Sequence, residues 1–198
     1  MKNLLLCGAG SAGANSIMIM IRDIPEIQKI VIIDFDKIEE RNLNTQPWKP
    51  SHVGEFKCDV LDELISDFGS CDSKFYNKRI ESVQELLDII QKENINVVMD
   101  CFDNVPSRNM VGEACSKAKI NCLHIGFAPE GSWLVQWDDK WVPMTESAEE
   151  NRVDICELQG VYAFLIKVSA YASLSMNLFV KEGKKQSFLG NVYTAHVL

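Results

Sequence analysis

The chain has 198 residues, enough for a domain with a sizeable hydrophobic core, and it carries a net charge of −8 with an isoelectric point near 4.9. Such an acidic chain argues against binding to the phosphate backbone of nucleic acids. No run reaches the roughly 18 apolar residues that are needed to span a membrane. Because Met1-Lys2 leads directly into an apolar run, we also expect no signal peptide.

The seven cysteines are an odd number, and none of them forms a C-x-x-C pair. We therefore expect no zinc site of ordinary spacing. Several of the cysteines lie in apolar runs and read as small buried hydrophobic residues, which is typical of a reducing compartment. The pattern predicts a cytoplasmic protein.

One predicted strand–helix–strand unit organises the chain. Residues 4–7 predict a buried strand, residues 15–22 predict a helix, and residues 30–33 predict a second buried strand. The unit takes about thirty residues, which is the length that such a crossover needs.

Three glycines between the first strand and the helix form the pattern G-x-G-x-x-G. Gly8 allows a tight turn out of the strand, Gly10 lets the backbone approach a phosphate, and Gly13 lets the helix pack close to the sheet. The first helical turn leaves N–H groups that point at an anion, and Ser11 in the loop before it is a further candidate to bind the nucleotide. The context predicts a nucleotide site, and the alternative is a glycine-rich turn that only packs.

Two acidic residues follow the second strand. Asp34 comes about 20 residues after Gly13, where a carboxylate can accept hydrogen bonds from ribose hydroxyls. Asp36 is a candidate to face a metal or the reacting phosphate. Together with the glycines, Asp34 predicts a nucleotide that contains ribose.

The polar segment 39–46 is predicted to be a loop that lies across this site. Asn42 and Gln46 offer amide donors there. The alternative for Asn42 is a turn or helix cap, a common role for asparagine.

A helix is predicted over residues 52–68, with Ser51 as its N-cap. Lys57 lies near the start of this helix, where a lysine opposes the helix dipole. A bound phosphate would explain that placement, and the alternative is an ordinary surface lysine.

A third apolar run, residues 96–102, predicts a strand that ends in Asp103-Asn104. Open α/β sheets bind ligands at the carboxyl ends of their strands. Asp103 is therefore a candidate for contact with a metal or pyrophosphate, and it is a better one than Asp100, which lies inside the strand run.

The whole pattern predicts an α/β, Rossmann-like three-layer fold with a mostly parallel sheet and antiparallel strands toward the C-terminal end. We expect residues 1–198 to form one domain, with a flexible loop at about 138–159. The remaining predicted elements are strands at 73–79, 120–127 and 132–137, a final edge strand at 187–192, and helices at 82–91, 105–117 and 161–180.

These motifs together resemble the ThiF/MoeB-type adenylating enzymes, relatives of the ubiquitin-activating enzymes. The resemblance covers nearly the whole chain, and its specificity comes from the order and spacing of the motifs. The matching segments are the glycine-rich loop 8–13, the D-x-D of Asp34 and Asp36 with Ile38, the N-L-N-x-Q of residues 42–46, the V-G-x-x-K of residues 53–57, the pair Asp103-Asn104 followed by Arg108, and Cys156 ahead of Gly160-Val161.

The resemblance implies an enzyme that binds ATP with magnesium and adenylates the C-terminal glycine carboxylate of a ubiquitin-like or sulfur-carrier protein or peptide. It implies that Asp34 holds the ribose and that Asp36 and Asn42 lie near ATP and its reacting phosphates. It further implies that Lys57 contacts phosphate and that Asp103 holds magnesium. Members of the family are commonly dimers, which implies a homodimer.

Many members of the family then transfer the acyl group to sulfur. Cys156 is the candidate for that step, because it precedes Gly160-Val161 as a family cysteine precedes its helix. The alternative is a structural cysteine at the start of a helix.

Two features depart from the family pattern. Thr45 stands where the family has a phosphate-binding arginine, and Arg41 lies in the same loop but out of register. Relatives often carry an N-terminal helix whose arginine reaches a neighbouring subunit, and we expect none before the first strand here. Two other hypotheses therefore remain: a catalytically degenerate nucleotide-binding scaffold or partner subunit, and an NAD-dependent oxidoreductase.

Overall fold

Five parallel strands form the half of the sheet that carries the candidate site. The computed structural model describes residues 2–69, 71–127, 131–139, 160–191 and 195–197. Within these ranges the parallel strands are β1 (Lys2–Cys7), β2 (Ile27–Asp34), β3 (Asp72–Asn77), β4 (Val97–Asp100) and β5 (Asn121–Phe127). The central strands consist mainly of apolar residues because helices cover both of their faces.

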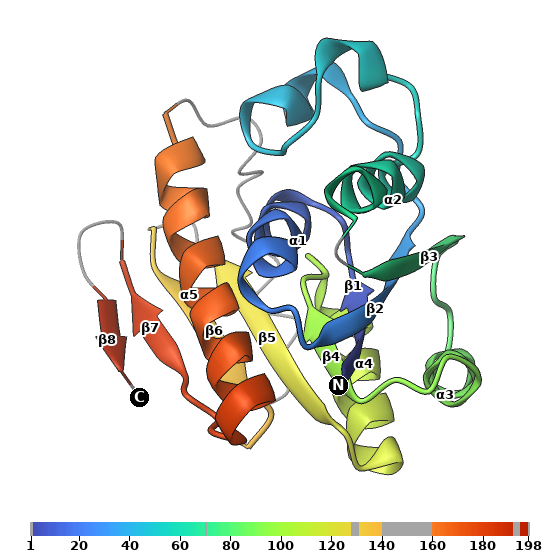
Figure 1. Cartoon of the computed structure of the whole chain (residues 1–198), viewed down its shortest axis with the longest axis vertical. Coiled ribbons are helices and arrows are strands. Elements are labelled where there is room, and N and C mark those ends of the chain that lie inside the picture. The colour runs from blue at the N-terminus through green and yellow to red at the C-terminus, as the bar shows by residue number, and fades with distance from the viewer. Residues whose placement is uncertain (1, 70, 128–130, 140–159, 192–194, 198) are drawn as a thin grey trace.

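Three antiparallel strands extend the sheet on the β5 side. They are β6 (Trp133–Trp137), β7 (Phe188–Gly190) and β8 (Ala195–Val197), and the strand order in the described residues is β3-β2-β1-β4-β5-β6-β7-β8 (Figure 1). The predicted mixed sheet is confirmed. The strand predicted at 187–192 is present as β7, but its prediction as the final edge strand is wrong, because β7 pairs on both sides and β8 forms the edge. Strands of three residues are too short to give a periodic signal.

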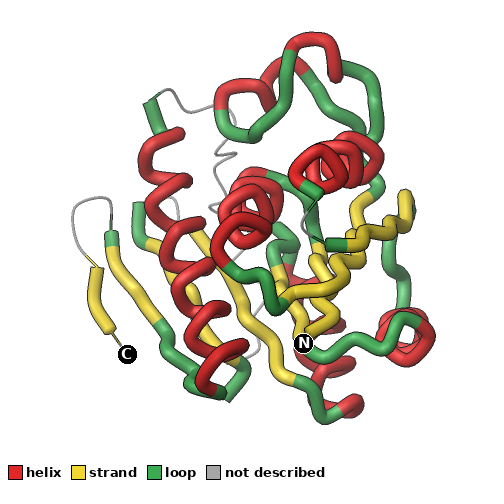
Figure 2. The backbone as a smooth tube through the Cα atoms, viewed as in Figure 1, coloured by secondary structure: helices red, strands yellow, loops and turns green. Residues whose placement is uncertain are grey.

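Helices cover both faces of the sheet in two layers (Figure 2). One layer contains α1 (Ser11–Asp23), α2 (Lys57–Phe68) and α5 (Tyr162–Glu182), and the other contains α3 (Val83–Lys92) and α4 (Val105–Ala118). Strand β1 shows how the sequence divides between them. Leu4 and Leu6 join the core with α1 and α5, whereas Leu5 and Cys7 join the core with α3 and α4. The three-layer prediction is confirmed.

Helix α5 packs in the core. It is long and apolar enough to cross a membrane by length and composition alone, but Val168 and Met176 are fully buried against α1 and the sheet. Trp133 and Trp137 are also buried, so the aromatic face of β6 belongs to the core. The helix ends at Gly183, which has a left-handed φ of 70°.

The segment before α2 differs from its prediction. The helix predicted over residues 52–68 begins only at Lys57, and Phe56 rather than Ser51 is its N-cap. Gly54 has a φ of 93°, a left-handed conformation that interrupts a helix, and Phe56 forms a β-bridge with Lys37. Two short 3₁₀ helices replace the predicted loop and first turn: η1 (Glu40–Asn44) and η2 (Pro50–His52).

Candidate nucleotide site

The strand order creates a topological switch point between β1 and β4. From β1 the sheet continues through β2 and β3 on one side and through β4 and β5 on the other. Ligands of open α/β sheets bind outside the carboxyl ends of the strands at such a point. The segments that leave β1, β2 and β4 there carry the glycine-rich loop, Asp36 and Asp103, so the fold gathers residues that are far apart in the sequence.

The glycine-rich loop has almost no room for side chains at two of its three glycines. Gly8 has a φ of 96°, and a Cβ there would lie 2.9 Å from the carbonyl oxygen of Cys101. A Cβ on Gly13 would lie 2.0 Å from the carbonyl oxygen of Gly8, so helix α1 can approach this closely only through a glycine. A Cβ on Gly10 would meet nothing within 4 Å, and this open space is where a phosphate is expected.

Asp34 holds the glycine-rich loop against the end of β2. Its Oδ2 accepts a hydrogen bond from the N–H of Ala9 at 2.6 Å, and its Oδ1 accepts one from the N–H of Asp36 at 2.8 Å. Burial raises the pKa of Asp34, although the charge of Lys57 and the two backbone donors oppose that rise. Each carboxylate oxygen has a second lone pair, so capacity for ribose hydroxyls remains. The bond to Ala9 was not predicted from the sequence.

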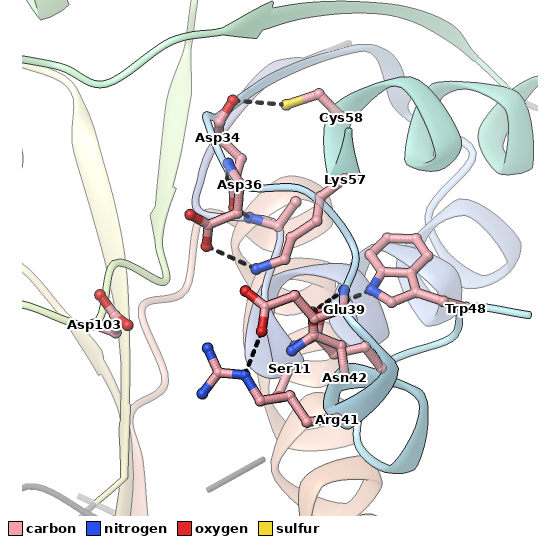
Figure 3. A network of polar contacts seen from close by, with 12 residues as sticks. Ser11, Asp34, Asp36, Glu39, Arg41, Asn42, Trp48, Lys57, Cys58 and Asp103 are labelled. Carbon is pink, nitrogen blue, oxygen red and sulfur yellow. Dashed lines mark hydrogen bonds and ion pairs between the residues drawn. The ribbon is translucent and has the colours of Figure 1, made fainter. Parts of the chain in front are cut away.

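Lys57 is a buried cation that pairs with Asp36 (Figure 3). Its Nζ lies 2.8 Å from Oδ2 of Asp36, and its side chain is 8% exposed compared with 48% for Asp36. The backbone N–H of Lys57 also donates to the carbonyl of Asp36 at 3.0 Å, which joins the start of α2 to the segment after β2. The interpretation of Lys57 as an ordinary surface lysine is therefore wrong.

The η1 segment has its own capping interactions. The Oδ1 of Asn42 accepts a hydrogen bond from the N–H of Glu39 at 2.9 Å, so Asn42 takes part in the capping box at the start of η1. Its contact with a nucleotide stays a prediction. The Nε of Arg41 donates to Oε2 of Glu39 at 2.7 Å. Figure 3 shows the Arg41 guanidinium turned toward the side on which Asp103 lies.

Thr45 fastens the η1 segment to helix α1. Its side chain is fully buried, its Oγ1 accepts a hydrogen bond from Oγ of Ser11 at 3.1 Å, and its carbonyl accepts one from Nδ2 of Asn15 at 2.8 Å. Gln46 is also buried, and its Oε1 accepts a hydrogen bond from Nε1 of Trp48 at 2.7 Å. Thr45 therefore packs the segment against α1, where an arginine of the family pattern would reach for phosphate.

Asp103 lies on the loop between β4 and α4, with its side chain exposed. Asn104 is the N-cap of α4, since its Oδ1 accepts a hydrogen bond from the N–H of Ser107 at 2.9 Å. Among the described residues no group of three or more His, Cys, Asp or Glu side chains forms a complete metal site. Magnesium commonly takes one or two protein carboxylates and fills its remaining positions with water and phosphate oxygens. An exposed Asp103 beside a phosphate site fits that ion.

The sequence interpretation missed a buried ionic cluster at the end of β4, the strand that leads to Asp103. Asp100, at the end of β4, contacts His124 of β5 and Arg108 of α4. From the sequence, Asp100 was expected inside a strand, and no contact was predicted for His124. The missing information was the register, since parallel pairing sets Asp100 directly beside His124.

Four thiols in the described part of the chain are poorly suited to nucleophilic attack. Burial raises the pKa of Cys7, Cys58, Cys101 and Cys122 above the ordinary value of a thiol. Cys156, the predicted sulfur residue, lies outside the described residues, so its role stays a prediction.

Solved structures share this architecture. E. coli MccB with ATP has a TM-score of 0.77 and 15% sequence identity, covering 100% of this chain and 62% of that chain. The complex of E. coli MccB with AMPCPP and MccA gives the same TM-score and identity over 100% and 63% of the two chains. PaaA has a TM-score of 0.77 at 12% identity over 100% and 64%. At these identities the likeness shows the fold.

Sequence comparisons give the family. Ubiquitin-like modifier-activating enzyme 5 of Bombyx mori is 25% identical over 125 residues, which are 59% of this chain and 31% of the relative. The enzyme of the same name from Aedes aegypti is 26% identical over 136 residues, 63% of this chain and 34% of the relative. The chain thus matches about a third of the length of these curated relatives. A sequence profile of the ThiF family matches residues 2–197, and the chain therefore belongs to the ThiF family.

Proposed function

We propose that this chain is an ATP-dependent adenylyltransferase that activates the C-terminal carboxylate of a ubiquitin-like or sulfur-carrier protein or of a peptide. The observation that carries the proposal is the convergence of the glycine-rich loop, Asp34, the Lys57–Asp36 pair and Asp103 at the switch point of the sheet. The ATP-bound MccB neighbour supports the nucleotide, and relatives named as ubiquitin-like modifier-activating enzymes support the substrate class.

The nucleotide is assigned to the loops that leave β1 and β2. Asp34 accepts hydrogen bonds from the ribose, as an acid at the end of the second strand does in nucleotide-binding βαβ units. The open space at Gly10 and the first-turn N–H groups of α1 receive phosphate oxygens. Asn42 and Gln46 shape the neighbouring wall, since their oxygens are used within the protein.

The reaction joins two anions, a carboxylate and a triphosphate, so positioning and charge neutralisation must supply the catalysis. The carboxylate oxygen bonds to the α-phosphorus, and pyrophosphate leaves with the electron pair of the broken P–O bond. Lys57 supplies positive charge to the phosphates from its place beside Asp36. Asp103 would hold magnesium, which supplies further neutralisation of the phosphate oxygens.

We assign a second protein cation to Arg41. Thr45 cannot provide it, because a threonine side chain carries no charge and this one is buried against α1. The Arg41 side chain is 49% exposed, and its contact with Glu39 turns the guanidinium toward the Asp103 side (Figure 3). With Arg41 in place of the missing family arginine, the site keeps a second cation, and we therefore favour an active enzyme over a degenerate scaffold. The family match and the named relatives favour neither that scaffold nor an NAD-dependent oxidoreductase.

Further assignments rest on the sequence pattern and the family resemblance. We propose that the protein acts as a cytoplasmic homodimer, that residues 1–198 form one domain, and that Cys156 accepts the acyl group after adenylation. In a complete assay, a Cys156→Ala variant should keep adenylation and lose the transfer to sulfur. Retention of both steps would make Cys156 a structural residue.

Calorimetric titration of the purified chain with ATP, with and without magnesium, and separately with NAD⁺, tests the site. We expect ATP to bind with an affinity that depends on magnesium, and NAD⁺ not to bind. Binding of NAD⁺ alone would assign the site to a different cofactor. Binding of neither nucleotide would indicate a degenerate site and would equally contradict the proposal.

A further inference from the structure

The buried cluster at the end of β4, just before the loop that carries Asp103, consists of Asp100, Arg108 and His124 and is named the Asp100 cluster. Asp100 and His124 are 0% exposed, and Arg108 is 7% exposed. Nδ1 of His124 lies 2.8 Å from Oδ2 of Asp100, and Nη2 of Arg108 lies 3.5 Å from the same oxygen. Buried ion pairs contribute little net stability, since desolvation offsets their attraction. A contribution to stability is therefore a weak explanation for these three buried side chains, and we look for a role in the neighbouring site.

The ring of His124 donates to Asp100. Burial would raise the pKa of Asp100, but the charge of Arg108 and the hydrogen bond from His124 outweigh burial and hold this pKa below its ordinary value. An ionised carboxylate can only accept, so the hydrogen in the contact belongs to Nδ1 of His124. The imidazole thus fixes Oδ2 of Asp100, and Oδ1 is directed at the backbone of the next loop.

Asp100 and Arg108 hold the backbone of Phe102 from both sides. The Oδ1 of Asp100 accepts a hydrogen bond from the N–H of Phe102 at 3.1 Å. The Nη1 of Arg108 donates to the carbonyl of Phe102 at 2.9 Å and to the carbonyl of Ile125 at 2.7 Å. The carbonyl of Phe102 lies in the same planar peptide as the N–H of Asp103. These bonds therefore orient the peptide group from which Asp103 projects.

The same loop also contacts the glycine-rich loop. A Cβ on Gly8 would lie 2.9 Å from the carbonyl oxygen of Cys101 and 3.3 Å from Cδ1 of Phe102. Because Gly8 has no Cβ, the two loops can pack this closely, and the N–H of Cys101 donates to the carbonyl of Cys7 at 2.8 Å. The glycine-rich loop therefore bounds one side of the loop that carries Asp103.

We propose that the Asp100 cluster is a positioning device that places the Asp103 carboxylate for a divalent cation bound together with the phosphates of ATP. The inference rests on the proposed function, because it takes Asp103 as the magnesium ligand. His124 is the member to change, because its contact with the loop runs through Asp100. It is a positioning residue, and its loss should affect the metal more than the nucleotide.

Manganese provides a readout other than activity. Mn²⁺ is titrated into the full chain with a non-hydrolysable ATP analogue, and free Mn²⁺ is followed by electron paramagnetic resonance. We expect His124→Leu to weaken Mn²⁺ binding about tenfold, the lower end of the loss when an outer-shell partner is removed, because His124 acts on Asp103 only through Asp100. Binding of the analogue without metal should stay within about twofold, since no supporting bond of a nucleotide ligand is removed.

His124→Asn is the conservative variant, because its side-chain amide can present an N–H at the place of Nδ1. We expect its Mn²⁺ affinity to stay within about threefold of the parent chain, since the supporting bond is kept. An equal loss in the leucine and asparagine variants would overturn a role that depends on this hydrogen bond.

Glu93→Gln is the matched control. Glu93 is a buried carboxylate paired with Lys29 at 2.5 Å and Lys74 at 2.6 Å, but it lies near the amino ends of the strands. We expect this variant to lose stability and to keep its Mn²⁺ affinity. A comparable loss of Mn²⁺ affinity in Glu93→Gln and His124→Leu would show general destabilisation and would overturn the inference.

Asp103→Asn separates this inference from the proposed function. Unchanged Mn²⁺ binding in Asp103→Asn would remove Asp103 from the metal site, and the proposed function would then need another ligand. Weakened binding in Asp103→Asn together with unchanged binding in His124→Leu would leave the proposed function intact and reject the positioning role.

Discussion

The space around each glycine of the glycine-rich loop determines whether a larger side chain can replace it. A Cβ at Gly13 would meet the backbone carbonyl of Gly8 at 2.0 Å, and a backbone group in a packed loop cannot move aside cheaply. A Cβ at Gly10 would meet nothing within 4 Å. Packing therefore explains Gly13, whereas Gly10, the N-cap of α1, leaves open space that fits a ligand.

Two alanine variants test this difference. We expect Gly13→Ala to lower the free energy of unfolding by about 2–4 kcal/mol through steric overlap. We expect Gly10→Ala to lose less than about 1 kcal/mol, as at other helix N-caps, while its methyl group occupies the phosphate space and weakens ATP binding. Urea unfolding and calorimetry measure the two effects. Wild-type ATP affinity in Gly10→Ala would mean that no phosphate lies there.

Arg41 can be tested in the same assay. A charge-assisted hydrogen bond to phosphate contributes about 1.5–3 kcal/mol, so we expect Arg41→Ala to weaken binding of magnesium and ATP roughly tenfold to a hundredfold. Arg22→Ala is the control, since that guanidinium lies 3.8 Å from the centroid of the Phe68 ring, in the last turn of α1. Equal affinities of the two variants would exclude Arg41 from the phosphate site.

At the residue scale the sequence predicted which residues gather but not their partners. The glycines, Asp34, Lys57 and Asp103 were predicted from motif spacing, and the fold brings their segments to one end of the sheet. The burial of Thr45 could not be predicted, because its partners on α1 lie thirty or more residues away in the sequence. Hydrogen bonds of that span require the fold to be known.

At the element scale, apolar runs and caps predicted most helices and strands because they are local signals. Helix α3 follows its N-cap Ser82, and helix α5 ends at Gly183. Prediction failed where one backbone angle changes the path of the chain, as at Gly54 ahead of α2. It also failed at β8, where three residues carry no periodic pattern.

Glu93 joins three elements near the amino ends of the strands. It lies directly after α3 and contacts Lys29 of β2 together with Lys74 and Tyr76 of β3. Burial raises its pKa, but the hydrogen bonds from these three side chains prevail and lower the pKa to about 2. The carboxylate therefore stays ionised in the folded protein over most of the acid range.

We expect Glu93→Gln to lose about 1–3 kcal/mol of stability at pH 7, allowing for the partial exposure of the lysines. The folded pKa of about 2 lies below the unfolded value of about 4.3, so this contribution is complete above about pH 5 and disappears as the pH falls toward 2. Urea unfolding from pH 7 to pH 2 should show the parent and the variant converging. A gap that does not depend on pH would mean that the ion pairs are not its source.

Glu113→Gln is the control for this measurement. Glu113 pairs with Lys117 one turn along α4, and both side chains are more than half exposed. Such a pair contributes less than about 0.5 kcal/mol, so we expect little change at any pH.

At the scale of the whole molecule, the sheet combines a parallel half that carries the site with an antiparallel end under α5. Trp48 reports on the first region, and Trp133 and Trp137 report on the second. If residues 1–198 form one domain, unfolding is a single cooperative transition. We expect urea curves from tryptophan fluorescence and from circular dichroism to coincide, in the parent chain and in Trp48→Phe. Separated midpoints would divide the chain into two folding units.

The overall architecture was predictable because the strand–helix–strand pattern and the family motifs constrain the same topology. The Asp100 cluster was not, because the side chains that form it belong to β4, α4 and β5. These side chains come together only when the three elements pack in the folded protein, and no spacing in the sequence indicates that contact.

The bonds that Thr45 makes with α1 have a consequence for how ligands reach the site. A segment whose threonine is fully buried and bonded to Ser11 and Asn15 moves with the helix, so η1 forms a fixed wall. Under the proposed function we expect ATP to enter and pyrophosphate to leave along the exposed side, past the carboxylates of Asp36 and Asp103. Asp36 is paired with Lys57, so Asp103 carries the exposed negative charge on this side. Under the proposed function we expect it to favour ATP that already carries its metal ion over free ATP.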